Sequence, residues 1–559
     1  MSESAFRDTF ARDHLPPLGQ WPVLEFTTEL LQYPERFNAA VELLDRQVAE
    51  LGPDRPALRT PAGEVWTYGE LQLRSAQVAQ VLTEDLGLVP GNRVLLRSPN
   101  NPWAVAAWLG VLRAGGIAVA TMAALRAREL GPILAKTRPV AALVDHRFVD
   151  EVRDVPVVAV GGTGADDLAR RAAGKSGRFA AVDTAADDVA LFGPTSGTTG
   201  VPKITVHFHR DLLSIDNTFG RCTLRLRPDD LVACTAPLAF TFGLGMLVVF
   251  PLRAGACAFL TESATPAQLA ELVAEHRVTV LATAPTAYRQ IVKSGLAERL
   301  SGLRCAVSAG EHIPREVWER LRAETGLRVV DGIGATELLH IFISAAGDEI
   351  RPGATGRPVP GFRATVLGPD GEELGPGVEG RLAVIGPVGC RYLDDERQAD
   401  YVVNGWNVTG DTFVRDEDGY YWYRARSDNM IVSSGYNIAG PEVEAAVDTH
   451  PDVLESAVVA APDAERGSVV CAFVVLRAGA AADAGTAKSI QDHVKRQLAP
   501  YKYPREVRFV EALPRNPSGK LQHFRLRRLV EDPTADPSAG TTADSAPGTA
   551  AGTTVEGTV

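Results

Sequence analysis

The sequence predicts an α/β protein with a large N-terminal domain of layered αβ sheets plus a β-rich subdomain, and with a small α+β C-terminal domain. Short apolar runs alternate with helix-period segments, a rhythm typical of parallel sheets covered by helices. After Gly353 turn signals separate strand-like runs, which is typical of hairpins. At 559 residues the chain also exceeds what one hydrophobic core usually supports, so two or more domains are expected.

The first elements follow an irregular lead-in. Apolar residues at helical spacing predict a helix over 37–50, and a Pro-Ala-Gly turn separates two predicted strands, 56–59 and 64–68. Thr67 with Glu70 three residues later matches a capping box, so the next helix is expected to begin there.

Strand and helix then alternate. Two helix-period segments, 102–113 and 125–137, lie between the earlier strands. The stretch 236–252 contains two prolines and two glycines and is too short and broken for a membrane span, so we interpret it as a buried loop and helix. The apolar runs that predict buried strands are 93–96, 117–120, 141–144, 157–160, 231–234, 278–283 and 303–308.

The last part of the chain has a different texture. Strands over 364–367 and 380–384 and a hairpin around 416–419 predict the β-rich subdomain. Beyond Asp428 two predicted helices and two predicted strands form a unit with its own core. The predicted boundaries are 1–427 for the N-terminal domain, 364–427 for its β-rich subdomain, 428–530 for the C-terminal domain and 531–559 for a tail whose Ala/Thr/Gly/Pro/Ser-rich composition predicts disorder.

Composition excludes several classes of function. The net charge is -12, and lysines and arginines are scattered rather than clustered, which argues against nucleic-acid binding. The six cysteines lie far apart without a Cys-x-x-Cys pair, which is typical of reduced core residues in a cytosolic protein. The start of the chain is charged and lacks the apolar segment of a secretory signal. A cytoplasmic protein without membrane attachment is therefore expected.

A glycine- and hydroxyl-rich loop, Phe192 to Lys203, is the first functional candidate. Its glycines let the backbone approach an oxyanion, its Ser/Thr hydroxyls can donate to phosphate oxygens, and Lys203 adds a positive charge. Apolar runs over 188–192 and 204–208 indicate a strand–loop–strand setting, whereas a Walker loop has two glycines separated by four residues and opens a helix. The loop therefore suits a polyphosphate, with a flexible surface linker as the alternative.

Four motifs follow this loop in order, and each by itself is compatible with an ordinary turn or a solvated tail. They are Ser308-Ala309-Gly310-Glu311, Asp331-Gly332-Ile333-Gly334-Ala335-Thr336-Glu337, Thr409-Gly410-Asp411 and Asn516-Pro517-Ser518-Gly519-Lys520. Together, over residues 30–530, the chain resembles the adenylate-forming enzymes, which include acyl- and aryl-CoA synthetases, peptide-synthetase adenylation domains and firefly luciferase. Segments 31–38, 237–245 and 337–342 narrow the resemblance to benzoate- and 2-aminobenzoate-CoA ligases.

The resemblance implies two steps: a carboxylate and ATP give an acyl-adenylate and pyrophosphate, and a thiol then displaces AMP. Lys520 would bridge the carboxylate and the α-phosphate, Glu337 would hold Mg²⁺, and Thr336 would contact the α-phosphate. The implied ATP-binding residues are Thr195, Ser196, Gly197, Thr198, Thr199, Lys203, Glu311, Asp331, Gly332, Ile333, Thr336, Asp411, Arg426 and Lys520.

The thiol step requires the C-terminal lysine to leave. In the family the C-terminal domain is mobile and rotates at a hinge that matches Asp428. The family often has a second Asp where this chain has Asn429, a departure from which we expect little consequence. After rotation, a loop matching Ser433, Ser434 and Gly435 would line a tunnel for the pantetheine of CoA.

The acyl pocket implied by the resemblance is lined by Phe240, Thr241, Phe242, Gly334, His340 and Ile341. No acid lies near Phe240 to pair an α-ammonium, so a free amino acid is disfavoured. Thr241 and His340 suit an ortho amino or hydroxyl group, which makes 2-aminobenzoate the first candidate, followed by benzoate and salicylate. A satisfied core histidine is the alternative for His340.

The sequence therefore predicts an ATP-dependent aryl-CoA ligase that uses ATP, Mg²⁺ and coenzyme A and acts as a monomer or a homodimer. One rival function is loading of the aryl group onto the phosphopantetheine of a carrier protein. That carrier would be a separate protein, because no carrier-domain serine motif lies in this chain. The other is a nucleotide-binding sensor without turnover, against which the intact Glu337, Asp411 and Lys520 argue.

Overall fold

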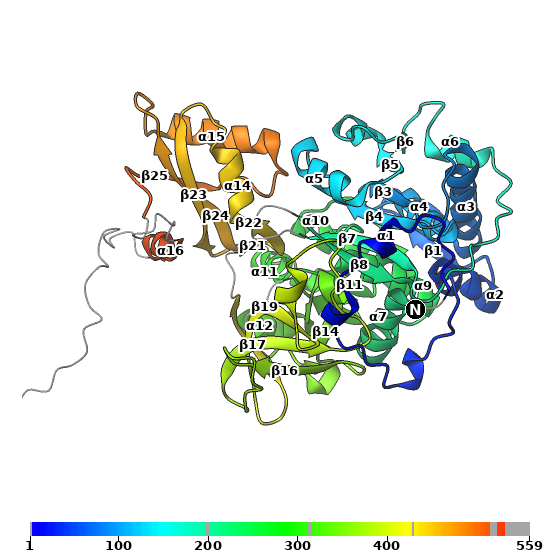
Figure 1. The fold of residues 1–559 in the computed structure, drawn as a ribbon. Coiled ribbons are helices and arrows are strands. Elements are labelled where there is room, and N and C mark those ends of the chain that lie inside the picture. Colours follow the sequence, from blue (N-terminus) through cyan, green and yellow to red (C-terminus); the bar gives the residue numbers. More distant parts are fainter. Residues whose placement is uncertain are drawn as a thin grey trace, which may run out of the picture.

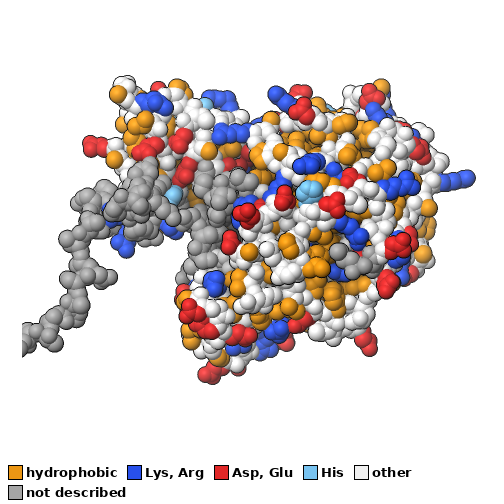
Figure 2. All heavy atoms as spheres, viewed as in Figure 1, with side chains coloured by type: hydrophobic (Ala, Val, Ile, Leu, Met, Phe, Trp, Pro, Cys, Tyr) orange, Lys and Arg blue, Asp and Glu red, His pale blue; other side chains and the backbone are white. Residues whose placement is uncertain are grey.

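A computed structural model describes residues 3–195, 202–310, 313, 315–426, 430–514 and 523–531. A large body carries the N-terminal elements, and a smaller unit built from the C-terminal strands and helices lies beside it (Figure 1). On the face shown in Figure 2, acidic and basic side chains are interspersed over the large body.

Two sheets form the core of the large body. In the six-stranded sheet all neighbours are parallel except the last pair, and in the nine-stranded sheet the central strands are parallel and three edge pairs are antiparallel. The six-stranded sheet runs β6 (Val157–Val160), β5 (Ala141–Asp145), β3 (Arg93–Arg97), β4 (Ile117–Thr121), β7 (Val189–Thr195), β8 (Lys203–Phe208). The nine-stranded sheet runs β15 (Arg357–Pro358), β14 (Ile341–Ser344), β13 (Val330–Gly334), β12 (Cys305–Ser308), β11 (Val280–Thr283), β9 (Leu231–Cys234), β10 (Cys257–Phe259), β1 (Pro56–Arg59), β2 (Val65–Thr67).

Helices fill the space between the two sheets and cover their outer faces. One buried cluster joins both sheets to α3, α4 and the helices between residues 209 and 254, while separate clusters pack α10 to α12 on one outer face and α5 on the other. The layers are therefore helix, sheet, helix, sheet, helix. The helices are α1 (Phe10–Asp13), α2 (Arg46–Leu51), α3 (Tyr68–Gln80), α4 (Pro102–Arg113), α5 (Ala127–Thr137), α6 (Leu168–Ala173), α7 (His209–Ile215), α8 (Thr241–Leu244), α9 (Phe250–Ala254), α10 (Pro266–His276), α11 (Pro285–Lys293), α12 (Arg315–Thr325) and α13 (Gln398–Tyr401).

A third sheet forms the predicted β-rich part. Its strands are antiparallel, and the turn at 416–419 joins the last two. They are β16 (Arg363–Leu367), β17 (Glu379–Ile385), β18 (Val402–Val403), β19 (Trp406–Arg415) and β20 (Tyr421–Arg426).

The C-terminal unit has its own buried cores on the two faces of a small sheet. One core lies under α14 and α15, and the other lies under α16. The bounds are β21 (Met430–Ser433), β22 (Tyr436–Ala439), α14 (Gly440–Val447), β23 (Val453–Asp463), β24 (Gly467–Leu476), α15 (Ala484–Gln497), β25 (Glu506–Phe509) and α16 (His523–Glu531). The predicted boundary at Asp428 lies outside the described residues, as does the predicted tail 531–559 apart from Glu531, which ends α16, so both stay predictions.

Local signals located most elements. The Thr67–Glu70 capping box is present, with both reciprocal hydrogen bonds. The helix predicted over 37–50 begins at Ala39 and contains a π-helical turn, Val41–Asp45, before α2. All six cysteines are free. Within the described ranges, no helix has both the length and the apolar character needed to cross a bilayer.

Candidate active site

The strands that flank the glycine-rich loop pair with each other. β7 and β8 are antiparallel with Thr195 opposite Lys203, so the chain leaves and re-enters the sheet at one place. Gly193 on β7 has no room for a side chain, because a Cβ would lie 2.6 Å from Thr205 Oγ1 and 3.1 Å from Thr336 Cγ2. The hairpin therefore packs directly against the segment that carries Thr336.

Three side chains, Lys203, Glu337 and Tyr392, form what we call the Glu337 cluster. Lys203 Nζ lies 2.7 Å from Tyr392 Oη and 3.4 Å from Glu337 Oε1, and the Tyr392 hydroxyl donates to the same carboxylate oxygen. Burial alone would raise the pKa of Glu337, but the Lys203 charge and the Tyr392 hydrogen bond lower it overall. Glu337 is thus a buried, ionised carboxylate.

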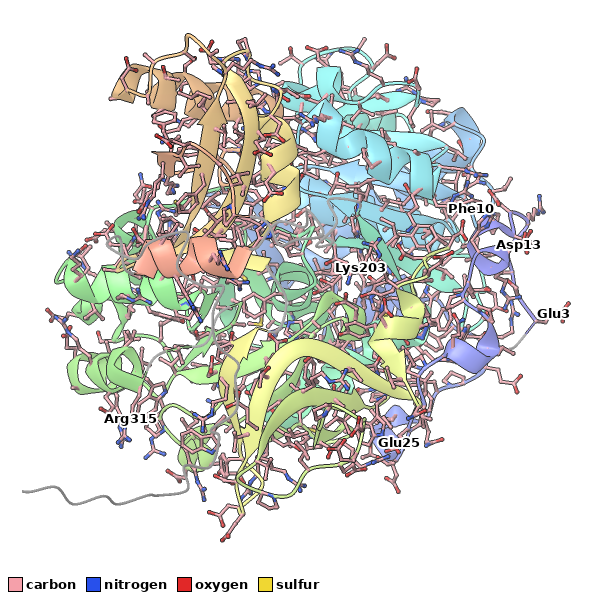
Figure 3. All side chains as sticks on the ribbon, turned by 60° about the vertical axis from the view of Figure 1, so that its left-hand side comes forward. Glu3, Phe10, Asp13, Glu25, Lys203 and Arg315 are labelled. Carbon is pink, nitrogen blue, oxygen red and sulfur yellow. The ribbon has the colours of Figure 1, made fainter. Side chains whose placement is uncertain are left out.

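Lys203 lies toward the centre of the molecule, whereas Glu3, Glu25 and Arg315 lie at its edge (Figure 3).

A buried polar chain supports the neighbouring Thr336. His207 Nε2 lies 2.8 Å from the Thr336 carbonyl oxygen, which can only accept, so this nitrogen carries the proton. Asp211 lies behind His207 and accepts a hydrogen bond of 2.9 Å from Arg391. Burial would raise the pKa of Asp211, but the Arg391 charge and His207 lower it to about 2. The hydrogen bond from His207 therefore fixes the backbone at Thr336.

The residues predicted to bind the nucleotide lie on strand β13 and on the strand pair β19–β20. Asp331, Gly332 and Ile333 are on β13, immediately before the turn that carries Thr336. A Cβ on Gly332 would lie within 3 Å of Ile341, so this close strand packing requires glycine. Burial raises the pKa of Asp331 well above its usual range. Asp411 on β19 pairs in register with Arg426 on β20.

Part of the predicted site falls outside the described residues, and the roles of these residues stay predictions. For Arg426 the structure describes the backbone in β20. The residues outside are Ser196, Gly197, Thr198, Thr199, Glu311, Asp428 and Lys520.

A cavity of about 590 Å³ begins beside Thr195 and Thr336 and reaches both the N-terminal body and the C-terminal unit. Thr195 ends β7 and Thr336 follows β13, so it opens where strand carboxyl ends meet, the usual ligand position in α/β sheets. From the C-terminal unit, Ser434 and Gly435 line it, whereas Ser433 is buried and does not. The residues predicted for the acyl pocket all line it: Phe240, Thr241, Phe242, Gly334, His340 and Ile341.

The wall of the cavity at His340 is backed by aromatic rings. The His340 ring has its centroid 4.7 Å from that of Phe250, 5.3 Å from Phe219 and 5.7 Å from Phe242, and the residue is 3% exposed. Burial lowers the pKa of His340 to about 3, which the Phe242 backbone only partly offsets. Neither ring nitrogen makes a well-formed hydrogen bond within the described part of the chain. His340 is therefore a neutral imidazole with polar capacity to spare, unlike a satisfied core histidine.

The C-terminal unit contributes a tight turn to the cavity mouth. Ser434 and Gly435 have φ values of 50° and 81°, so both central residues of the β21–β22 hairpin are left-handed. The Gly435 backbone lies against Gly310 at the end of β12, and a Cβ on Gly435 would be 3.4 Å from Ala284 Cβ. The turn therefore covers the strand ends of the large body.

Several cavity residues were missed from sequence. Tyr436, Tyr501 and Lys502 line the cavity from the C-terminal unit, and Glu129 lines it from α5. They carry no local motif signal, because they meet only through tertiary contact. Within the described residues there is no group of three or more His, Cys, Asp or Glu side chains that could by itself hold a metal ion.

Comparison with known proteins agrees with this geometry. Residues 44–391 match the AMP-binding enzyme family, and residues 442–520 match the AMP-binding enzyme C-terminal domain. The chain belongs to the AMP-binding enzyme family. It is an AMP-forming acid–CoA ligase with a large N-terminal and a small C-terminal domain, so the predicted family and fold class are confirmed.

Three of the similar proteins are named as ligases of aromatic acids. The benzoate–CoA ligase of Thauera aromatica is 35% identical over 515 residues, covering 90% of this chain and 98% of the relative. The 3-hydroxybenzoate–CoA ligase of Aromatoleum sp. (strain CIB) is 31% identical over 517 residues, covering 88% and 97%. The crystal structure of the anthranilate CoA ligase AuaEII in complex with anthranoyl-AMP shares 29% identity with a TM-score of 0.69, covering 90% of this chain and 99% of its own.

Proposed function

We propose that the protein is an ATP-dependent aryl-CoA ligase, with 2-aminobenzoate as the first candidate substrate and benzoate or salicylate next. The observation that carries this proposal is that one cavity is lined by the aromatic residues around His340, by the Thr336 segment and by the Gly435 turn. Relatives that act on benzoate, 3-hydroxybenzoate and anthranilate support it.

The aromatic part of the cavity around His340 suits a flat ring. Phe242 and Ile341 offer apolar contact, and burial there contributes about 25 cal/mol per Å² of apolar surface. An ortho amino or hydroxyl group could bond the spare nitrogen of neutral His340, while Thr241 Oγ1 could donate or accept. This pairing is the reason to rank 2-aminobenzoate first.

The first half-reaction brings two anions together. An oxygen of the carboxylate forms a bond to the α-phosphorus of ATP, and the bond to the pyrophosphate oxygen breaks. Lys203 would neutralise charge on the transferred phosphates from the base of the glycine-rich loop, and Thr336 would contact the α-phosphate. By resemblance Lys520 bridges the two reacting anions. Asp411 and Arg426 would hold the ribose, beside the β13 wall.

One residue of the site, Glu337, is suited to bind Mg²⁺. Glu337 is a buried carboxylate kept ionised by Lys203, and Mg²⁺ commonly takes one or two protein carboxylates together with phosphate oxygens. When bound, the ion would supply charge neutralisation for the departing pyrophosphate. Glu337 would hold it, and Tyr392 would orient Glu337.

The second half-reaction needs a narrow path for a thiol. The sulfur forms a bond to the acyl carbon, and the bond between that carbon and the AMP oxygen breaks. The Gly435 turn lies at the cavity mouth and would flank the pantetheine. The same path would admit the phosphopantetheine of a carrier protein, which is the second candidate acceptor. A cytoplasmic location and a monomeric or homodimeric state stay predictions.

Pyrophosphate release with ATP and Mg²⁺ tests the proposal. The panel is benzoate, 2-aminobenzoate, salicylate, a fatty acid and phenylalanine, each with and without CoA. We expect CoA-dependent turnover of one benzoate. Release that ignores CoA would favour carrier loading, and no release with any acid would revive the sensor.

A further inference from the structure

Lys502 lies at the contact between the C-terminal unit and the large body. Its Nζ is 2.8 Å from Glu129 Oε1 on α5 and 2.9 and 2.8 Å from the two oxygens of Glu442 on α14. Lys502 is 5% exposed. We call these three residues the Lys502 cluster. One carboxylate belongs to the large body, and the other carboxylate and the ammonium belong to the C-terminal unit.

The residues beside Lys502 reach the cavity mouth. The Ala499 N–H donates to Glu129 Oε2 at 2.9 Å, and the Tyr501 hydroxyl lies 3.6 Å from Met122 Sδ of the large body. The Tyr501 ring stacks on Tyr436, which follows Gly435, with centroids 4.3 Å apart. The cluster is thus connected to the Gly435 turn through one pair of stacked rings.

The charges make this contact depend on Lys502. Both carboxylates bind one ammonium, so they lie within about 6 Å of each other, a distance at which like charges interact strongly. Burial and Glu129 raise the pKa of Glu442, and Lys502 counters them. Without the ammonium, two buried carboxylates would repel, which disfavours this arrangement. By contrast, Lys293 and Glu465 form an exposed ion pair across the contact, and such pairs contribute little.

We propose that Lys502 is a positioning residue for the thioester-forming half of the reaction: through Glu129 and Glu442 it holds the C-terminal unit with the Gly435 turn at the cavity mouth. This inference rests on the proposed function, in which the same unit must bring Lys520 to the site in the other half. An ion-pair cluster split between the two units can form in one arrangement and separate in the other, so it biases the equilibrium between them.

Half-reactions of Lys502→Met test the proposal. Thioester formation from pre-made aryl-adenylate and CoA is expected to slow about 100-fold, while pyrophosphate release stays within about twofold of wild type. Lys502→Arg should recover much of the loss because it retains the charge. Lys495→Met is the matched control, since Lys495 is half-exposed and contacts Asp492 and Tyr503 within the same unit. Equal loss of both half-reactions, or no loss, would overturn the proposal.

Lys502→Met combined with Glu129→Gln isolates the electrostatic cause. Removing one carboxylate relieves the repulsion, so the double variant should form thioester faster than Lys502→Met alone, whereas a folding defect would add to the loss. A rate equal to or below that of the single variant contradicts the charge argument.

Cross-linking separates this inference from the proposed function. Lys293→Cys and Glu465→Cys in one chain, joined by a short bismaleimide, report the arrangement without any substrate. Cross-linking should fall severalfold in the Lys502→Met background and remain in the Lys495→Met background. This result would support the inference even if no aromatic acid is turned over, and unchanged cross-linking would overturn it.

Discussion

The Glu337 cluster and the Lys502 cluster are both buried and both belong to the region of one cavity, but they differ in what they connect. Lys203, Glu337 and Tyr392 all come from the large body, so their contacts persist however the C-terminal unit sits. The Lys502 cluster spans both parts. Its contacts exist only in the arrangement described here.

This difference separates residues that act on a reaction step from residues that act on the arrangement of the two parts. A charge cluster within one rigid body can set the electrostatics of a reaction step, because its geometry is preorganised. A cluster shared between two bodies sets how long they stay together. Variants of the first cluster should therefore change adenylation, and variants of the second should change thiol transfer.

The largest expected effect is that of Glu337→Gln. Loss of the ionised carboxylate removes the only predicted protein ligand for Mg²⁺, so pyrophosphate release should fall about 1000-fold, while pre-made adenylate should still react with CoA. Rapid-quench measurement of each half-reaction checks this. Glu262→Gln is the control, because it removes a half-exposed carboxylate from a pair with Arg147. An equal fall in both half-reactions would contradict the division.

Gly435→Leu tests the opposite side of the comparison. The residue has a φ of 81°, and a side chain there would extend toward Ala284 at the cavity mouth, so thioester formation should fall about 100-fold with pyrophosphate release spared. Gly419→Leu separates backbone strain from obstruction, because Gly419 also has a φ of 81° but open space around it. If both variants behave alike, obstruction of the path is not the cause.

Tyr392→Phe sharpens the account of the Glu337 cluster. Without the hydroxyl, Glu337 keeps its charge partner but loses its orienting hydrogen bond, so adenylation should slow about tenfold and require more Mg²⁺. Titration of pyrophosphate release with Mg²⁺ measures both quantities. Tyr421→Phe is matched, since it removes a buried hydroxyl that bonds the Ala364 carbonyl in the third sheet. A Mg²⁺ requirement like that of wild type would refute the orienting role.

Sequence reasoning predicted what is local or carried by motif. The capping box at Thr67, the β7–β8 hairpin and the aromatic end around Phe242 all follow from short segments, and the structure contains them. The short strands that were not predicted include β10, β14, β15, β18, β25 and the β21–β22 pair. Each of these strands has only two to four residues and is stabilised by its neighbours rather than by a long apolar run.

The positioning residues could not be predicted from the sequence. Tyr392 is 55 residues from Glu337, and Lys502 is 373 residues from Glu129. Neither lies in a motif, and no period or spacing pairs positions so far apart. The motifs locate the groups that would touch substrate, whereas the groups that hold them in place emerge only when the chain is folded.

The smallest expected effect concerns His340, which belongs to neither cluster. Its pKa is about 3 in the folded protein against about 6.5 in the unfolded chain, so below pH 6.5 the unfolded state binds a proton that the folded state does not. This burial therefore leaves stability unchanged above pH 6.5 and costs about 2 kcal/mol by pH 5. His340→Phe should reduce the fall in unfolding temperature between pH 7.5 and pH 5 by a few degrees. An unchanged pH dependence in His340→Phe would show that this imidazole is not buried in its neutral form. The cavity around His340 would then accommodate a charged group.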